Sequence, residues 1–177
     1  MTAARKYAVQ VTAVANGAAT ITATSGSVNT TATATVSQVA AAVALSPTSL
    51  SLASIGATAT LTPTVTDTGG TTISGATVTW ATSSSSVATV SSAGLVTAVA
   101  NGTATITATA GTVSATASVT ILQVASTVTV SPSEKTFTSA GDTVTLAATV
   151  NDAGGTVISG PTVTWSSTNT AVATVSS

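Results

Sequence analysis

Short stretches of alternating apolar and polar residues run through most of the chain. In 58–66, threonines alternate with Ala59, Leu61, Pro63 and Val65. A period of two is typical of a β-strand with one buried face. Similar alternation over 104–108 and 113–121 predicts further strands, and glycine-containing clusters separate the stretches as turns do. Threonine and valine, which dominate the composition, favour strands because two heavy atoms on Cβ fit a pleated surface.

Two turn signals are more specific. Pro47 interrupts a strand that begins at 43–45, as proline does at a sheet edge or where a strand changes sheets. The pair Asn101-Gly102 predicts a two-residue hairpin turn, because both turn positions need a positive φ. Asn16-Gly17 is the same pair near the start of the chain. Seven or eight short strands separated by such turns predict an all-β fold, an antiparallel β-sandwich.

The whole pattern repeats along the chain with a period of about 85 residues, which is typical of a tandem array of domains. The clearest pairs at this spacing are Val11 with Val96, Asn16 with Asn101, and Trp80 with Trp165. The period predicts three parts: 1–41 is the C-terminal half of a repeat, 42–126 is a complete repeat, and 127–177 is the N-terminal half of another. Within the first part, 1–7 is atypical, because it does not resemble the repeat at that position.

The same period predicts the core and the turns of each copy. Trp80 is the one large core residue of the complete repeat, and many other inward positions are alanine or valine, so the two sheets should pack closely around it. The predicted core residues are Trp80, Trp165, Leu61, Leu146, Ile106, Ile21, Val78 and Val163. The predicted turn residues are Asn16, Gly17, Asn101 and Gly102.

Neither half can bury its core alone, because half a sandwich exposes apolar strand faces and an unpaired edge. We expect the 127–177 half to be completed by the 1–41 segment of a neighbouring copy, head to tail. Such a contact builds a filament unless it closes into a ring. The alternative is that covalent neighbours in a longer tandem array supply the missing strands.

Several segments of the complete repeat carry a family resemblance. They are Val78 to Trp80, Val87 to Val90, Gly94 to Val99 and Gly102 to Ala108, preceded by Leu45-Ser46-Pro47. Together they resemble the bacterial Ig-like domain, group 2, and the resemblance extends over residues 8–177. It implies an Ig-like sandwich of the kind found in bacterial surface adhesins, secreted proteins and phage tail or capsid proteins. It implies no activity, and the fold alone does not supply one.

Composition excludes several classes of function. The chain has no histidine and no cysteine, so neither a Ser-His nor a Cys-His nucleophile can be built. We predict no enzyme, no catalytic residue and no cofactor. A net charge of −1 gives no field that would attract nucleic acid. No apolar run approaches the length of a membrane helix, so we predict no membrane insertion.

The few acidic residues also indicate no metal site. Asp67 and Asp152 are equivalent positions in successive copies, and in glycine-rich turns they should accept hydrogen bonds from nearby backbone N–H groups. The linkers 38–41 and 123–126 contain no acid, whereas calcium needs about six oxygen ligands. We therefore expect no calcium, and we expect linker rigidity to come from short length and the lack of glycine.

The leading interpretation is a structural segment of an extracellular bacterial fibre or adhesin stalk, with copies of itself as partners. The alternative is an Ig-like domain of a phage virion. Surface glycans are a further class of ligand, but sugar platforms need exposed aromatic rings. With both tryptophans in the predicted core, that interpretation depends on Tyr7.

Overall fold

The computed structural model describes residues 7–176, and these residues form strands and turns with no helix. The all-β prediction is therefore confirmed. The atypical segment 1–7 lies outside the described residues except for Tyr7. The strands are β1 Gly17–Ser25, β2 Val28–Val36, β3 Ala42–Ser46, β4 Ser49–Leu52, β5 Thr58–Thr60, β6 Thr62–Thr66, β7 Thr79–Thr82, β8 Ala88–Val90, β9 Leu95–Ala98, β10 Gly102–Ala110, β11 Val113–Ile121, β12 Thr127–Ser131 and β13 Ala147–Asn151.

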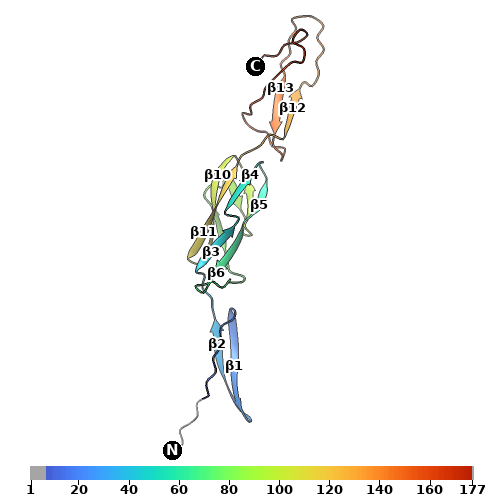
Figure 1. Ribbon diagram of the computed structural model, residues 1–177. Coiled ribbons are helices and arrows are strands. Elements are labelled where there is room, and N and C mark those ends of the chain that lie inside the picture. Colours follow the sequence, from blue (N-terminus) through green and yellow to red (C-terminus); the bar gives the residue numbers. More distant parts are fainter. Residues whose placement is uncertain (1–6, 177) are drawn as a thin grey trace, which may run out of the picture.

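Strands β3 to β11 form a two-layer sandwich, called here the central domain (Figure 1). One layer has the strand order β4-β11-β10-β7. The other contains the pair β3-β6 and the group β5-β9-β8, with β5 and β6 separated only by Leu61. All pairs are antiparallel except β4 with β11, which is parallel.

Proline explains how the first part of the domain contributes to both layers. On one side of Pro47, β3 pairs with β6, and on the other side β4 pairs with β11. Proline has no N–H to donate, so continuous pairing is interrupted there and the chain changes sheets, as predicted. The 58–66 stretch keeps its predicted alternation: Leu61 and Val65 are buried, and the intervening threonines are mostly exposed.

The core lies between the two layers and consists of small and branched side chains. Ile106, Val119, Leu61, Val96 and Ile121 are at most 1% exposed. Alanines of β10 and β11 fill the positions between them, so the layers approach closely. Burial of branched apolar side chains is the main term that stabilises such a domain. Trp80 packs against this core from one side and remains half-buried.

The hairpin predicted at Asn101-Gly102 is wrong. Strand β9 pairs with β5 and β8, whereas β10 pairs with β11 and β7, so Asn101 lies where the chain crosses from one layer to the other. Among the described residues only glycines have positive φ, and Gly102 has φ 143°. A Cβ at Gly102 would lie 3.1 Å from Val87 Cγ2. The positive φ and the nearby Val87 side chain together account for the glycine, and Asn101 has another role described below.

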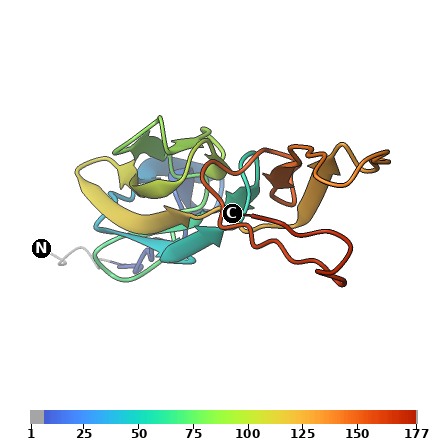
Figure 2. The ribbon, with the colours of Figure 1, turned by 90° about the horizontal axis from the view of Figure 1, so that it is seen from above.

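The two ends of the chain flank the central domain at opposite poles (Figure 1). The N-terminal hairpin consists of β1 and β2, which are paired from Gly17 with Val36 at one end to Ser25 with Val28 at the other. The C-terminal segment of the chain, residues 127–176, is called here the C-terminal half. It has one strand pair, β12-β13, followed by a segment without regular strand pairing. Viewed along the long axis, this half is set to one side of the central domain (Figure 2). The molecule is therefore elongated, with a two-stranded sheet at each end.

Candidate functional site at the domain junctions

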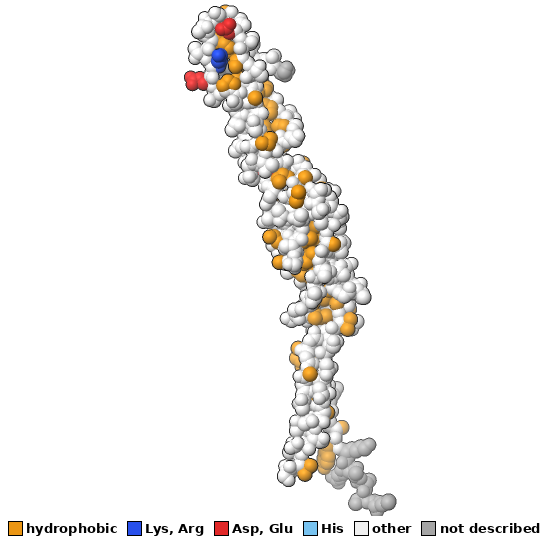
Figure 3. Space-filling view, turned by 180° about the vertical axis from the view of Figure 1, so that it is seen from behind, with side chains coloured by type: hydrophobic (Ala, Val, Ile, Leu, Met, Phe, Trp, Pro, Cys, Tyr) orange, Lys and Arg blue, Asp and Glu red, His pale blue; other side chains and the backbone are white. Residues whose placement is uncertain are grey.

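Residues 7–176 offer few groups for metal binding or acid–base chemistry. These residues contain no group of three or more His, Cys, Asp or Glu side chains that could hold a metal ion. They also contain no helix long and apolar enough to cross a membrane. On the face drawn in Figure 3, the visible acidic and basic side chains lie at the far end of the C-terminal half. The polar chemistry of the molecule is instead concentrated at two domain junctions.

The C-terminal junction contains Asn101, Gln123 and Asp152, which come from three separate parts of the chain. Asn101 lies at the crossover before β10, and Gln123 lies in the linker that follows β11. The Gln123 N–H donates to Asn101 Oδ1 at 2.8 Å. The Asn101 side-chain amide donates back to Gln123 Oε1 at 3.1 Å. This reciprocal pair holds the linker against the pole of the central domain.

Asp152 joins the linker to the next domain. It follows β13 and is 2% exposed. One carboxylate oxygen, Oδ2, accepts from the Gln123 side chain and from the Ile55 N–H of the central domain, both at 2.9 Å. The other oxygen accepts from two N–H groups of its own turn, those of Gly154 at 3.0 Å and Thr156 at 2.9 Å. One side chain therefore bonds the linker, the preceding domain and its own turn.

Four donors keep this buried carboxylate ionised. Burial raises the pKa of Asp152, but hydrogen bonds from Gln123 and from the Ile55, Thr156 and Gly154 N–H groups outweigh burial, so the net pKa lies below 3.8. An unpartnered buried carboxylate would behave in the opposite way. The ionised form is thus the form that fits the junction.

The N-terminal junction has the same design one period earlier in the chain, with Asn16, Gln38 and Asp67. The Gln38 N–H donates to Asn16 Oδ1, and the Gln38 side chain donates to Asp67 Oδ2 at 2.8 Å. Asp67 Oδ1 accepts from Gly69 at 3.0 Å and Thr71 at 2.9 Å. Hydrogen bonds from Gln38, then from Thr71 and Gly69, lower the pKa of Asp67 against a smaller effect of burial.

The two junctions differ in two side-chain hydrogen bonds. The Asn101 side chain donates to Gln123 Oε1, whereas no such bond joins the Asn16 side chain to Gln38 among the described residues. Asp152 receives the Ile55 N–H from the preceding domain, whereas Asp67 receives no corresponding bond from the described part of the N-terminal hairpin. The glycines two residues after each aspartate, Gly154 and Gly69, differ in the same way. A Cβ at Gly154 would lie 2.8 Å from the Ile55 carbonyl oxygen, but a Cβ at Gly69 would meet only Asp67 Oδ1 at 3.4 Å.

Backbone hydrogen bonds also fix the linker between the central domain and the C-terminal half. The Leu122 N–H donates to Leu52 O at 3.0 Å, and the Val124 N–H donates to Ala53 O at 2.9 Å. Ser126 then donates to Asn151 O of the next domain at 2.8 Å. The linker therefore continues as paired backbone, and these hydrogen bonds restrain it in addition to its short length and lack of glycine.

The predicted core residues fall into two groups. Leu61 and Ile106 are fully buried in the central domain, where Val78 and Trp80 are half-buried. In the two end segments, Ile21, Val163 and Trp165 are half-buried and Leu146 is 36% exposed. For glycan binding, the exposed rings among the described residues are Tyr7, which is 91% exposed, and Phe137, which is 42% exposed.

Sequence reasoning found the local bonds of Asp67 and Asp152 but missed the junctions. The linkers themselves contain no acid, so no junction was predicted there. The acid comes from a turn of the following domain, 29 residues after the glutamine. A signal was present. In a chain made mostly of threonine, serine, alanine and valine, an asparagine, a glutamine and an aspartate each recur at the spacing of the repeat.

Comparison with known families identifies the central domain. The family model described as "Bacterial Ig-like domain (group 2)" matches residues 39–121. The central domain is a bacterial Ig-like domain of group 2. The match covers the whole sandwich, from the linker that holds Gln38 to the end of β11. No curated protein matches the chain.

Among solved structures, the chain is similar to parts of the S-layer protein SbsC. For domains 4 and 5 of that protein, the identity is 28%, the match covers 60% of this chain and 58% of that chain, and the TM-score is 0.44. For its domains 1–6, the identity is 25%, the coverage is 81% and 20%, and the TM-score is 0.46. The chain therefore spans less than two thirds of the length of these structures.

Proposed function

We propose that this chain is a non-catalytic structural segment of an extracellular bacterial fibre or adhesin stalk, in which tandem Ig-like domains hold a terminal element away from the cell. The observation that carries the proposal is the junction motif. Asn101, Gln123 and Asp152 fix one domain end to the next, and Asn16, Gln38 and Asp67 repeat the arrangement. A motif that recurs at each linker is suited to transmitting a fixed orientation along a string of domains.

Three further features support this role. The family of the central domain supports a surface location, the chain is elongated, and the described residues contain no candidate metal cluster. The total charge is small, so electrostatic recognition of a charged polymer contributes little. A spacer requires stiffness and resistance to unfolding, and the hydrogen-bonded linker and close-packed core supply these properties.

The location is tested by immunogold labelling of intact producing cells with antibodies against the central domain. We expect gold particles outside the cell envelope. Label confined to the cytoplasm would contradict the proposal. Label on purified virions, with none on cells, would replace it with the phage alternative.

Stiffness is tested separately by small-angle X-ray scattering on dilute protein. We expect one extended conformation, in keeping with the elongated arrangement in Figure 1. The double variant Gln38→Ala, Gln123→Ala should show a broader distribution of lengths. An equally broad distribution in the unmodified protein would contradict the role of the junctions.

A further inference from the structure

The C-terminal half presents an apolar strand face whose counterpart in the central domain is covered by a second layer. Strands β12 and β13 pair in the register of β3 and β6, with every partner shifted by one period of the repeat. Val65 and its counterpart Val150 are both buried, at 4% and 3% exposure, but other positions differ: Leu45 is 7% exposed in the central domain. In the C-terminal half the position of Leu45 is taken by Val130, which is 39% exposed, and Leu146 is 36% exposed where Leu61 is fully buried. This face is therefore an unfinished core.

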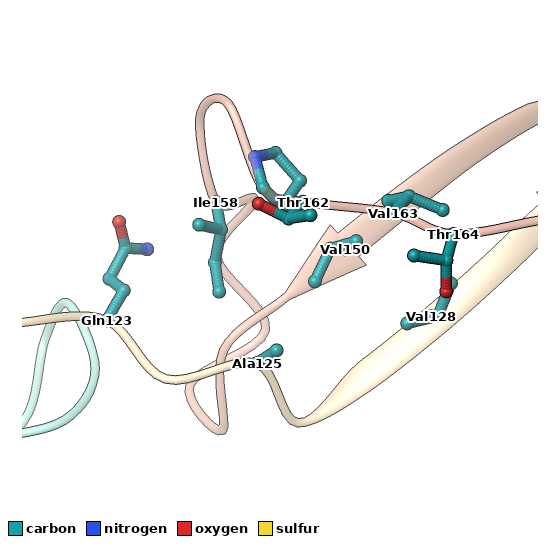
Figure 4. Close-up of a pocket in the computed structure, with 9 residues that line it drawn as sticks. Gln123, Ala125, Val128, Val150, Ile158, Thr162, Val163 and Thr164 are labelled. Carbon is teal, nitrogen blue, oxygen red and sulfur yellow. The ribbon is translucent and has the colours of Figure 1, made fainter. Parts of the chain in front are cut away.

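A hollow of about 450 Å³ lies beside this strand face (Figure 4). In the central domain, seven residues pack together in one cluster. Six of the residues that line the hollow occupy the positions of six of these seven, one period later in the chain. These six are Ala125, Val128, Val150, Ile158, Pro161 and Val163. The seventh member of the central cluster is Ala110, the last residue of β10, which is 2% exposed. The end of β10 thus narrows the equivalent space in the central domain, where a smaller hollow of about 180 Å³ remains beside Val65 and Ile73.

The chain contains a second copy of the strands that close this space. Strands β1 and β2 match β10 and β11 in length and pair in the same register, again shifted by one period. Ser25 at the end of β1 corresponds to Ala110. Ile21 is half-buried where Ile106 is fully buried. A hairpin without a covering layer is only marginally stable in water, so this hairpin also lacks a partner.

We propose that the hairpin β1–β2 of a second copy of this chain docks on the C-terminal half and completes its sandwich. The hairpin and the C-terminal half of one chain lie at opposite poles of the central domain, so the two cannot meet within one copy (Figure 1). Because the two surfaces differ, the contact is heterologous and extends into a filament. The inference rests on the structural role proposed above and names its partner.

The pairing of β10 and β11 in the central domain gives the expected register. Ala108 pairs with Trp80, and Ile121 pairs with Leu52. Shifted by one period, Ala23 of one copy pairs with Trp165 of the other, and Val36 pairs with Phe137. The second pair is complementary in size: the hairpin has a smaller residue than Ile121, and the C-terminal half has a larger one than Leu52. The segment around Trp165, which has no strand pairing in the single chain, becomes an edge strand beside β1.

The docked segment begins after residue 9. Val9 stands where the central domain has Gly94, and a Cβ at Gly94 would lie 2.4 Å from Leu61 O and 2.8 Å from Trp80 Cζ2. A valine there cannot follow the path of Gly94. Docking also completes the N-terminal junction, because the Ala140 N–H of one copy takes the place of Ile55 and reaches Asp67 of the next.

The first test measures association of the unmodified chain by sedimentation velocity and negative-stain electron microscopy over a range of concentrations. We expect end-to-end filaments whose length increases with concentration. A monodisperse monomer at the highest soluble concentration would overturn the proposal. Such a monomer could still label the cell surface, so this result and failure of the proposed structural role are distinguishable.

A matched pair of charge substitutions tests the interface. Ile21→Glu places a carboxylate in the docked core, whereas Thr20→Glu places it on the opposite face, where the equivalent Thr105 is exposed. Ile21→Glu should weaken association by roughly tenfold or more, and Thr20→Glu should change it by less than about twofold. Circular dichroism should show the central domain unchanged in both variants. Equal effects on association would overturn the proposal.

A mixing experiment tests direction. Chains with Ile21→Glu retain a competent C-terminal half, and chains with Leu146→Glu retain a competent hairpin. Each variant alone should remain monomeric, and the mixture should stop at one-to-one dimers. If the mixture forms no dimers, or if either variant alone forms filaments, the proposal is wrong.

Discussion

The hairpins β1–β2 and β10–β11 have the same strand lengths, the same register and closely similar sequences, but they have different surroundings. In β10, Ala104, Ile106 and Ala108 are at most 5% exposed. At the corresponding positions of β1, Ala19 and Ala23 are exposed and Ile21 is half-buried. The comparison shows that strand pairing follows from the local alternating pattern, whereas burial depends on a second layer that lies elsewhere in the chain.

The two junctions extend this comparison. Both hold a linker glutamine between an asparagine and an aspartate, but only the C-terminal junction has a complete domain on its N-terminal side. That domain supplies the Ile55 N–H, and Asp152 accepts four hydrogen bonds where Asp67 accepts three from the described residues. The difference again comes from neighbouring structure and not from the motif.

The largest expected effect comes from truncating the matched isoleucines. Ile106→Ala should lower the free energy of unfolding of the central domain by about 2–5 kcal/mol, because it leaves a cavity in a packed core. Ile21→Ala in dilute protein should change it by less than about 0.5 kcal/mol, since Ile21 lies outside that domain. Urea denaturation followed by tryptophan fluorescence measures both. Comparable losses would mean that the hairpin already belongs to the core of the same chain.

The next effect separates the junctions. Gly154→Ala places a methyl group 2.8 Å from the Ile55 carbonyl oxygen and should open the C-terminal junction. Hydrogen exchange at the Ile55 N–H should accelerate by roughly tenfold or more, because this group loses its acceptor. Gly69→Ala is the matched control and should leave the dilute chain unchanged. In the filament, however, Gly69→Ala should weaken association. There the Ala140 backbone of the neighbouring copy lies against residue 69, as Ile55 lies against Gly154.

Acid should act on both junctions in the same direction. The pKa values of Asp67 and Asp152 lie below 3.8 in the folded chain, so ionisation stabilises the folded junctions. This contribution is fully present above about pH 4 and is lost as the pH falls through the lowered folded pKa values. Scattering measurements between about pH 6 and about pH 2 should show the linkers loosening at the acid end. In the double variant Asp67→Asn, Asp152→Asn, this loosening between neutral and acid pH should be absent.

The smallest effect compares the glutamines. Gln38→Ala removes the donor to Asp67 Oδ2, so the pKa of Asp67 should rise toward its ordinary value. Gln123→Ala should raise the pKa of Asp152 less, because the Ile55, Gly154 and Thr156 N–H groups remain as donors. Carboxyl chemical shifts in an NMR titration measure both values. A larger rise at Asp152 would show that the Ile55 contact does not support that carboxylate in solution.

Much of the fold was predictable from sequence because strand formation is local. Alternation in 58–66 and 113–121 identified strands and their buried faces, and Pro47 identified the change of sheet. The error at Asn101-Gly102 arose because a hairpin and a crossover use the same turn residues. Which one forms depends on whether β10 pairs with the strand before it or with β7 and β11.

Sequence alone was enough to predict the all-β class, the strand positions and the local hydrogen bonds of Asp67 and Asp152, because these depend on residues a few positions apart. It took the fold to show that Asp152 also bonds Ile55, 97 residues away, and that Asn101 supports a linker and not a hairpin turn. The same holds for the burial of Ile106 and the exposure of Leu146. Burial and long-range hydrogen bonds depend on which segments meet in space, and a residue's own neighbours in the chain do not specify that.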